Sequence, residues 1–181
     1  MSRMRKLSRQ SAEGWVPHDH EAVYELQEHR LQAALPAEQA TVMRRLAQCL
    51  APPYALLYVL HTPRGEAPAG RYQSPSIDRE QLSAFLDRFG AYLAADARFD
   101  LWLHSAEEQA TLVWDRHDLL YAYGPIKKLR DALEALGFKP GQPQVGFAHQ
   151  HHYRAEFDAD ARALLQHWDW THTPLQPGDE Q

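Results

Sequence analysis

A continuous apolar run at residues 54–61 constrains this chain more than any other feature. Its sequence is Tyr-Ala-Leu-Leu-Tyr-Val-Leu-His, preceded by Pro52 and Pro53 and followed by Pro63. Prolines interrupt regular structure, and a short apolar run between them is typical of a strand buried on both faces. The run is far shorter than the roughly 20 residues that cross a bilayer as a helix. The sequence therefore predicts a central strand of a sheet and no transmembrane helix.

Helical patterns occur on both sides of this strand. Residues 21–35 and 36–50 predict an N-terminal pair of antiparallel helices. Asp78 and Gln81 carry the signature of a capping box and precede an apolar stripe at Leu82, Phe85, Leu86, Phe89 and Leu93. Further helices are expected at residues 125–136, before Gly137, and at residues 158–168.

Strand-like runs supply the rest of the sheet. They are expected at residues 99–104, 110–115, 119–123 and 144–151. The short polar segment between the second and third of these runs predicts a β-hairpin. Residues 62–75 contain three prolines and two glycines and therefore predict a long surface loop.

The order of these elements predicts an α+β fold with a mixed or antiparallel sheet of about five strands. It resembles the ferredoxin-like arrangement with one additional strand, an N-terminal helical pair and a C-terminal helix, and a profilin-like sheet is the alternative. The resemblance is one of topology alone. Neither fold supplies a residue motif that this chain matches, so neither implies a function.

Length and composition favour a single domain. A chain of 181 residues can bury a core without metal or disulfide support, and its five Trp and eight Tyr are not typical of disorder. Residues 15–172 are predicted to form the α+β domain, between a flexible basic tail at 1–14 and an irregular tail at 173–181. The single cysteine, Cys49, excludes an intramolecular disulfide, so a reducing, cytoplasmic location is expected.

The charged residues give little sign of a nucleic-acid partner. The formal net charge is −5, which argues against a broad phosphate-binding surface, and we find no nucleotide-cofactor motif. Lys127, Lys128 and Arg130 would attract an anion near a helix start, but such residues more often form a solvated helix face. A protein or a small molecule is the expected partner, with no membrane contact, and the sequence does not indicate an oligomeric state.

Histidines near the end of the chain suggest a metal site. On a strand, His149 and His151 would point the same way and could bind one transition-metal ion. Zinc usually needs three or four protein ligands. The ligands beyond His149 and His151 would have to come from His61, His104, Asp100 or Glu156. Two ligands alone favour the simpler interpretation of exposed or hydrogen-bonded histidines at a strand end.

A second group of candidates is an aromatic and polar face of the sheet. Asp100, Trp102 and His104 alternate on one side of their strand, and Tyr58, Trp114 and Tyr121 are expected nearby. Such side chains combine apolar area with hydrogen-bonding tips, as small-ligand pockets require. The ordinary interpretation is that the N-terminal helical pair covers this face as part of the core.

The polar segment Asp115–Asp118 mixes carboxylates with an imidazole. That combination suits acid–base chemistry, but its place in a predicted hairpin turn favours ordinary turn formers. Since no catalytic motif is evident, the leading hypothesis is a noncatalytic module that binds a protein or a small ligand. The alternative is a small metal-dependent enzyme, perhaps a hydrolase, that uses clustered histidines. Whether the chain is an enzyme stays open at this point.

Overall fold

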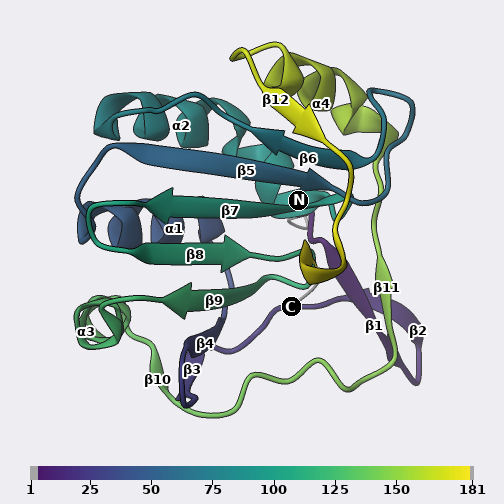
Figure 1. The fold of residues 1–181 in the computed structure, drawn as a ribbon. Coiled ribbons are helices and arrows are strands. Elements are labelled where there is room, and N and C mark those ends of the chain that lie inside the picture. The colour runs from purple at the N-terminus through teal and green to yellow at the C-terminus, as the bar shows by residue number, and fades with distance from the viewer. Residues whose placement is uncertain (1–3, 180–181) are drawn as a thin grey trace.

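The computed structural model describes residues 4–179, which form an α+β fold. Within this range the strands build one nine-stranded sheet and one three-stranded sheet, accompanied by four α-helices (Figure 1). The strands are β1 Leu7–Ser11, β2 Gly14–Pro17, β3 Val23–Leu26, β4 Leu31–Ala34, β5 Tyr54–Leu60, β6 Gly70–Gln73, β7 Phe99–Ser105, β8 Ala110–Trp114, β9 Leu119–Tyr123, β10 Lys139–Pro140, β11 His149–His151 and β12 Thr171–Thr173. The helices are α1 Gln39–Gln48, α2 Arg79–Ala95, α3 Ile126–Ala135 and α4 Asp158–Leu165, with short 3-10 turns at Ala155–Phe157 and Pro177–Asp179.

The large sheet has the strand order β10-β3-β4-β9-β8-β7-β5-β6-β12. Its neighbouring strands are antiparallel except for β10 and β3, which are parallel, so the sheet is mixed. The small sheet, with order β11-β1-β2, crosses one end of the large sheet (Figure 1). This second sheet brings the N-terminal strand and a late segment of the chain to the loops at the ends of β8 and β9.

Helices α1 and α2 lie behind the large sheet in Figure 1 and cover one of its faces, the helix face. Alternation along β7 places Phe99, Leu101 and Leu103 in the core beneath them, while Trp102 and His104 point to the opposite, front face. The predicted capping box at the start of α2 is confirmed. Asp78 Oδ1 accepts from the Gln81 backbone N–H at 2.8 Å, and Gln81 Oε1 accepts from the Asp78 backbone N–H. The predicted central strand at residue 54 onward is also confirmed as β5, between β7 and β6.

The expectation of about five strands, in a ferredoxin-like or a profilin-like arrangement, is wrong. So is the N-terminal helical pair, because residues 21–35 form the hairpin of β3 and β4 and only the second predicted helix exists, as α1. The apolar spacing of this segment fits a helix loosely, but β4 completes the hydrogen bonding of β9 and buries Leu31, Ala33 and Ala34. The periodicity of a short apolar run does not distinguish a helix from a strand, so pairing with a distant strand can determine its conformation.

Several strands lie where loops or tails are expected. Strand β6 falls inside the predicted loop 62–75, and β12 overlaps the start of the predicted C-terminal tail. Strand β1 falls inside the predicted basic tail 1–14, and there Lys6 and Leu7 are buried. Residues 1–3 and 180–181 of the two predicted tails lie outside the described residues. Among the described helices, none combines the length and the apolar character that crossing a membrane would require.

Candidate metal centre

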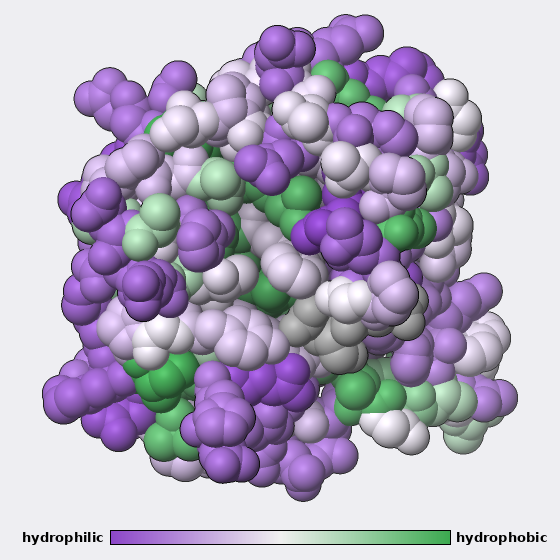
Figure 2. Space-filling view, viewed as in Figure 1, coloured by the Kyte–Doolittle hydropathy of each residue, from purple (hydrophilic) through white to green (hydrophobic). Residues whose placement is uncertain are grey.

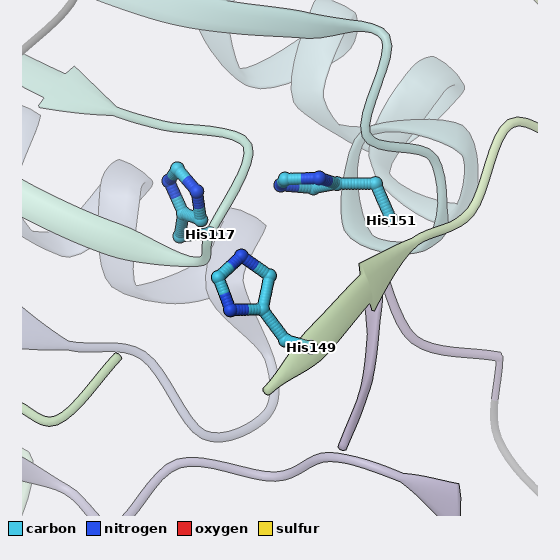
Figure 3. Close-up of side chains that lie close together, drawn as sticks. All are labelled: His117, His149 and His151. Atoms are coloured by element: carbon cyan, nitrogen blue, oxygen red, sulfur yellow. The ribbon is translucent and has the colours of Figure 1, made fainter. Parts of the chain in front are cut away.

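Strand β11 and the β8–β9 turn bring three histidines together. In the small sheet, β11 pairs with β1 so that His149 lies opposite Arg9 and His151 opposite Leu7. Because they are two residues apart on one strand, both imidazoles extend to the same side. The turn between β8 and β9 faces them and carries His117, and the three rings point into a common space (Figure 3).

The distances between these rings suit a metal ion that draws its ligands inward. One ligand nitrogen from each of His117, His149 and His151 lies within 4.8 Å of the others, and the ring centroids are 4.8 to 5.4 Å apart. Tetrahedral zinc with Zn–N bonds of about 2.1 Å holds its donor nitrogens roughly 3.4 Å apart. Zinc binding would therefore require small side-chain rotations that bring the three ligand nitrogens closer together. In the described part of the chain, this is the only group of three or more ligand-type side chains close enough to hold one ion.

In two of the three rings, a hydrogen bond at Nδ1 leaves Nε2 as the nitrogen that can bind a metal. His117 Nδ1 lies 3.0 Å from Asp115 Oδ2, and His149 Nδ1 lies 3.0 Å from the Phe147 carbonyl oxygen. A carboxylate and a carbonyl accept hydrogen bonds, so each Nδ1 carries the proton and each Nε2 keeps its lone pair. Metal-binding histidines in proteins are held by outer partners of this kind.

The third ring, His151, has the protonation state that a ligand needs. Burial, reinforced by the neighbouring His117 and His149, lowers the pKa of His151 to about 4, so its imidazole is neutral at neutral pH. Its Nε2 is buried and has no hydrogen-bond partner among the described residues. A buried polar atom without a partner is costly, and a bound ion would satisfy it.

The turn that carries His117 is held by its own side chains. Asp115 Oδ1 accepts hydrogen bonds from the backbone N–H groups of His117 at 2.8 Å and Leu119 at 2.9 Å. Asp118 has a left-handed backbone with φ of 57°, which Asp tolerates better than most residues. The same aspartate that bonds the His117 ring therefore also shapes the loop beneath it.

The sequence-predicted ligands are only partly brought together. His149 and His151 share the cluster, but the sequence pattern links the third member, His117, only to acid–base chemistry or to an ordinary turn. His61 is instead bonded to Asp100, with Nε2 2.9 Å from Oδ2, and His104 is exposed and bonded to Thr111. His61, His104, Asp100 and Glu156 are not part of the three-histidine group. The only sequence signal for His117 was an imidazole beside Asp115 in a tight turn.

The six residues predicted to form an aromatic ligand site lie on two sides of the large sheet. Tyr58 and Trp114 belong to the helix face, where Tyr58 Oη is 2.7 Å from Tyr92 Oη and Trp114 Nε1 donates to Asp118 at 2.8 Å. Asp100, Trp102, His104 and Tyr121 lie on the front face, where Trp102 of β7 and Tyr121 of β9 both pair with Val113 of the intervening β8. Burial raises the pKa of Tyr121 to about 12, so its hydroxyl stays protonated.

The front face contains a hollow near its middle, with apolar side chains at its floor (Figure 2). A pocket of about 280 Å³ lies on this face, lined by Ala55, Leu56, Leu57, Gln73, Trp102, His104 and Thr111. Trp102 is half-buried, and its Nε1 is buried without a partner among the described residues. The pocket is thus apolar with a few polar groups, as small-ligand sites are.

The basic residues of α3, which the sequence assigns to a solvated helix face rather than to an anion site, have their charges paired. Lys127 Nζ is 2.7 Å from Asp131, Lys128 Nζ is 3.0 Å from Glu108, and Arg130 also pairs with Asp131. Two of the cations therefore share the carboxylate of Asp131, and the third is paired with Glu108 before β8. Such surface ion pairs are common and do not by themselves indicate a ligand.

Comparisons of the chain with protein-family models, with curated proteins and with solved structures give no match. No family or relative therefore supplies an activity for the three histidines. Their role has to be inferred from the chemistry of their donor atoms.

Proposed function

We propose that this protein binds one divalent transition-metal ion, zinc in the first place, through Nε2 of His117, His149 and His151. The observation that carries the proposal is the convergence of three imidazoles, two of which have Nδ1 bonded to Asp115 or to the Phe147 carbonyl. Neutral imidazole is a good ligand for zinc, copper, iron and nickel, and three of them are a common zinc donor set.

The donor set further supports a catalytic rather than a purely structural ion. Structural zinc is closed by four protein ligands, whereas catalytic zinc keeps three and leaves one position for water. All three histidines are only half-buried, so water and a small substrate have access. A zinc ion held by these three histidines would lower the pKa of a bound water to about 7 and so supply a nucleophile at neutral pH, which makes a small metal-dependent hydrolase the enzyme class that fits.

Two measurements test this proposal. Isothermal titration of metal-stripped protein with zinc chloride should give one site per chain, and the matched control His104→Ala, which removes an exposed histidine of the front face, should leave it unchanged. Hydrolysis of a panel of activated carboxylic and phosphate esters should then depend on zinc. Failure to bind zinc, cobalt or manganese would remove the metal proposal, whereas binding without hydrolysis would remove only the catalytic part.

A second candidate function is noncatalytic binding of a small ligand at the front-face pocket. The specific observation in its favour is the partnerless Nε1 of Trp102, which a flat ligand with a hydrogen-bond acceptor would satisfy. A fragment screen should return hits that lose affinity in Trp102→Phe and keep it in Trp15→Phe, because Trp15 is exposed on the small sheet. Hits that bind both variants equally would contradict this site.

We also propose that the protein works in a reducing cytoplasm and that its partner is a small molecule or a protein. Cys49 is free and half-buried, so the described fold uses no disulfide. The net charge of −5 argues against a nucleic-acid partner. Fractionation of cells that express the tagged chain tests the location directly, and recovery in an oxidising compartment would contradict it.

A further inference from the structure

The residue before β1, Lys6, is a fully buried cation. Its exposed fraction is 0%, and its Nζ lies over the rings of Trp114 at 4.3 Å and Phe99 at 5.0 Å. An ammonium group loses its hydration when it is buried, and an apolar side chain of similar size would fill this space without that loss. The charge must therefore be compensated by specific partners.

Those partners lie in the turn that carries His117. Lys6 Nζ donates to the Asp115 carbonyl oxygen at 3.1 Å and pairs with Asp118 Oδ1 at 3.5 Å. Asp115 is also the residue whose side chain bonds His117 Nδ1. Lys6 thus contacts the turn at residues before and after His117 in the sequence.

The backbone of Lys6 reaches the other half of the cluster. The Lys6 carbonyl oxygen accepts from the His152 N–H at 2.8 Å, and the next residue, Leu7, lies opposite His151 in the β1–β11 register. One residue therefore connects the strand of His149 and His151 to the turn of His117. Within the described residues these two elements belong to different sheets, so their spacing depends on contacts of this kind.

We propose that Lys6 is a positioning residue that sets the distance between His117 and the two histidines of β11. The inference rests on the proposed metal site, because it assigns to Lys6 a role in metal affinity. Lys6 touches no metal-binding nitrogen and acts through Asp115, Asp118 and the β1–β11 pairing. Residues that hold metal ligands from outside typically change metal affinity by about 10- to 100-fold when they are replaced.

The first test compares Lys6→Met, which keeps the length of the side chain and removes its charge, with Lys127→Met, which removes an exposed lysine of α3. Zinc affinity should fall about 10- to 100-fold in Lys6→Met and stay unchanged in Lys127→Met. The visible spectrum of cobalt-loaded Lys6→Met should shift toward that of His117→Ala, because the His117 ligand would be displaced from its position. A merely structural role would lower the melting temperature and leave the cobalt spectrum native.

A double-mutant cycle separates the failure of this inference from the failure of the metal site. If Lys6 acts by placing His117, adding Lys6→Met to His117→Ala should change zinc affinity less than twofold. Wild-type protein without zinc binding would overturn the proposed function itself. Wild-type binding together with an unchanged affinity in Lys6→Met would overturn only the role of Lys6. Should Lys6→Met not fold, Lys6→Gln takes its place with the same expected loss.

Discussion

Within residues 4–179, two histidine–aspartate pairs differ in which ring nitrogen the carboxylate bonds. At the His61–Asp100 pair the carboxylate bonds Nε2, and both side chains are almost fully buried, with exposed fractions of 7% and 4%. At the His117–Asp115 pair the carboxylate bonds Nδ1, and the ring lies against the imidazoles of His149 and His151. The first arrangement satisfies a buried polar pair, whereas the second prepares an imidazole for an external ligand.

The largest expected effect comes from removing a ligand of the cluster. His117→Ala should weaken zinc binding by more than about 100-fold, because replacing even an outer partner of a ligand costs about 10- to 100-fold. His61→Ala should leave zinc affinity unchanged. Competition titration with a zinc chelator measures both affinities. Equal affinities in wild type and His117→Ala would contradict the assignment of the His117–Asp115 pair, and not the His61–Asp100 pair, to metal binding.

The next effect concerns the carboxylate that fixes the His117 tautomer. In Asp115→Asn the amide N–H₂ can face Nδ1, which then has to accept, so the ring proton moves to Nε2 and blocks the metal position. We expect a zinc affinity about 10-fold lower or more, with the turn largely kept because one oxygen remains for the backbone N–H groups. Nitrogen-15 NMR of the imidazoles reports the tautomer, and an unchanged Nδ1-protonated His117 would contradict the argument.

The His61–Asp100 pair should appear in stability instead. His61→Ala leaves Asp100 Oδ2 buried without its partner, and losing a hydrogen bond to a buried charged group costs about 2 kcal/mol. Urea denaturation measures the change in the free energy of unfolding, with the exposed His104→Ala as control. A loss below about 0.5 kcal/mol would mean that the pair contributes no more than a surface contact.

The smallest effect is the pH dependence of the metal-free protein. The pKa of His151 falls from 6.5 in the unfolded chain to about 4 in the fold, so the unfolded state binds more protons between these values. The folded state is therefore most stable with respect to this group above pH 6.5. As the pH falls toward 4, the free energy of unfolding decreases by on the order of 1 kcal/mol after allowance for solvent screening. Unfolding at pH 7 and pH 4.5 should show a smaller difference in His151→Phe than in wild type, and an equal difference would contradict this assignment.

The sequence predicts elements well where local signals agree with the tertiary partner. The capping box at Asp78, the alternation from Phe99 to Leu103 and the turn after Trp114 all have short-range causes, and all are present in the structure. The helix predicted for residues 21–35 is wrong because the pairing of β4 with the distant β9 determines the conformation of this segment. No periodicity within the segment reports that partner.

The candidate site was predictable only in part for the same reason. The spacing of His149 and His151 is a local signal, and it indicates a shared direction on a strand. The approach of His117 depends on the small sheet, which forms because β1, expected to be a basic tail, pairs with β11. The buried Lys6, just before that strand, cannot be distinguished in the sequence from the basic residues around it.

The measurement that tests the central claim most directly is X-ray absorption at the zinc edge of stoichiometrically loaded protein. Its fine structure counts imidazole ligands and gives their distances from the metal. We predict three imidazole nitrogens and one oxygen ligand, all at about 2.0 to 2.1 Å, and one imidazole fewer in His117→Ala. Two or fewer imidazoles in the wild-type protein, or the same spectrum in the variant, would contradict a metal centre built from His117, His149 and His151.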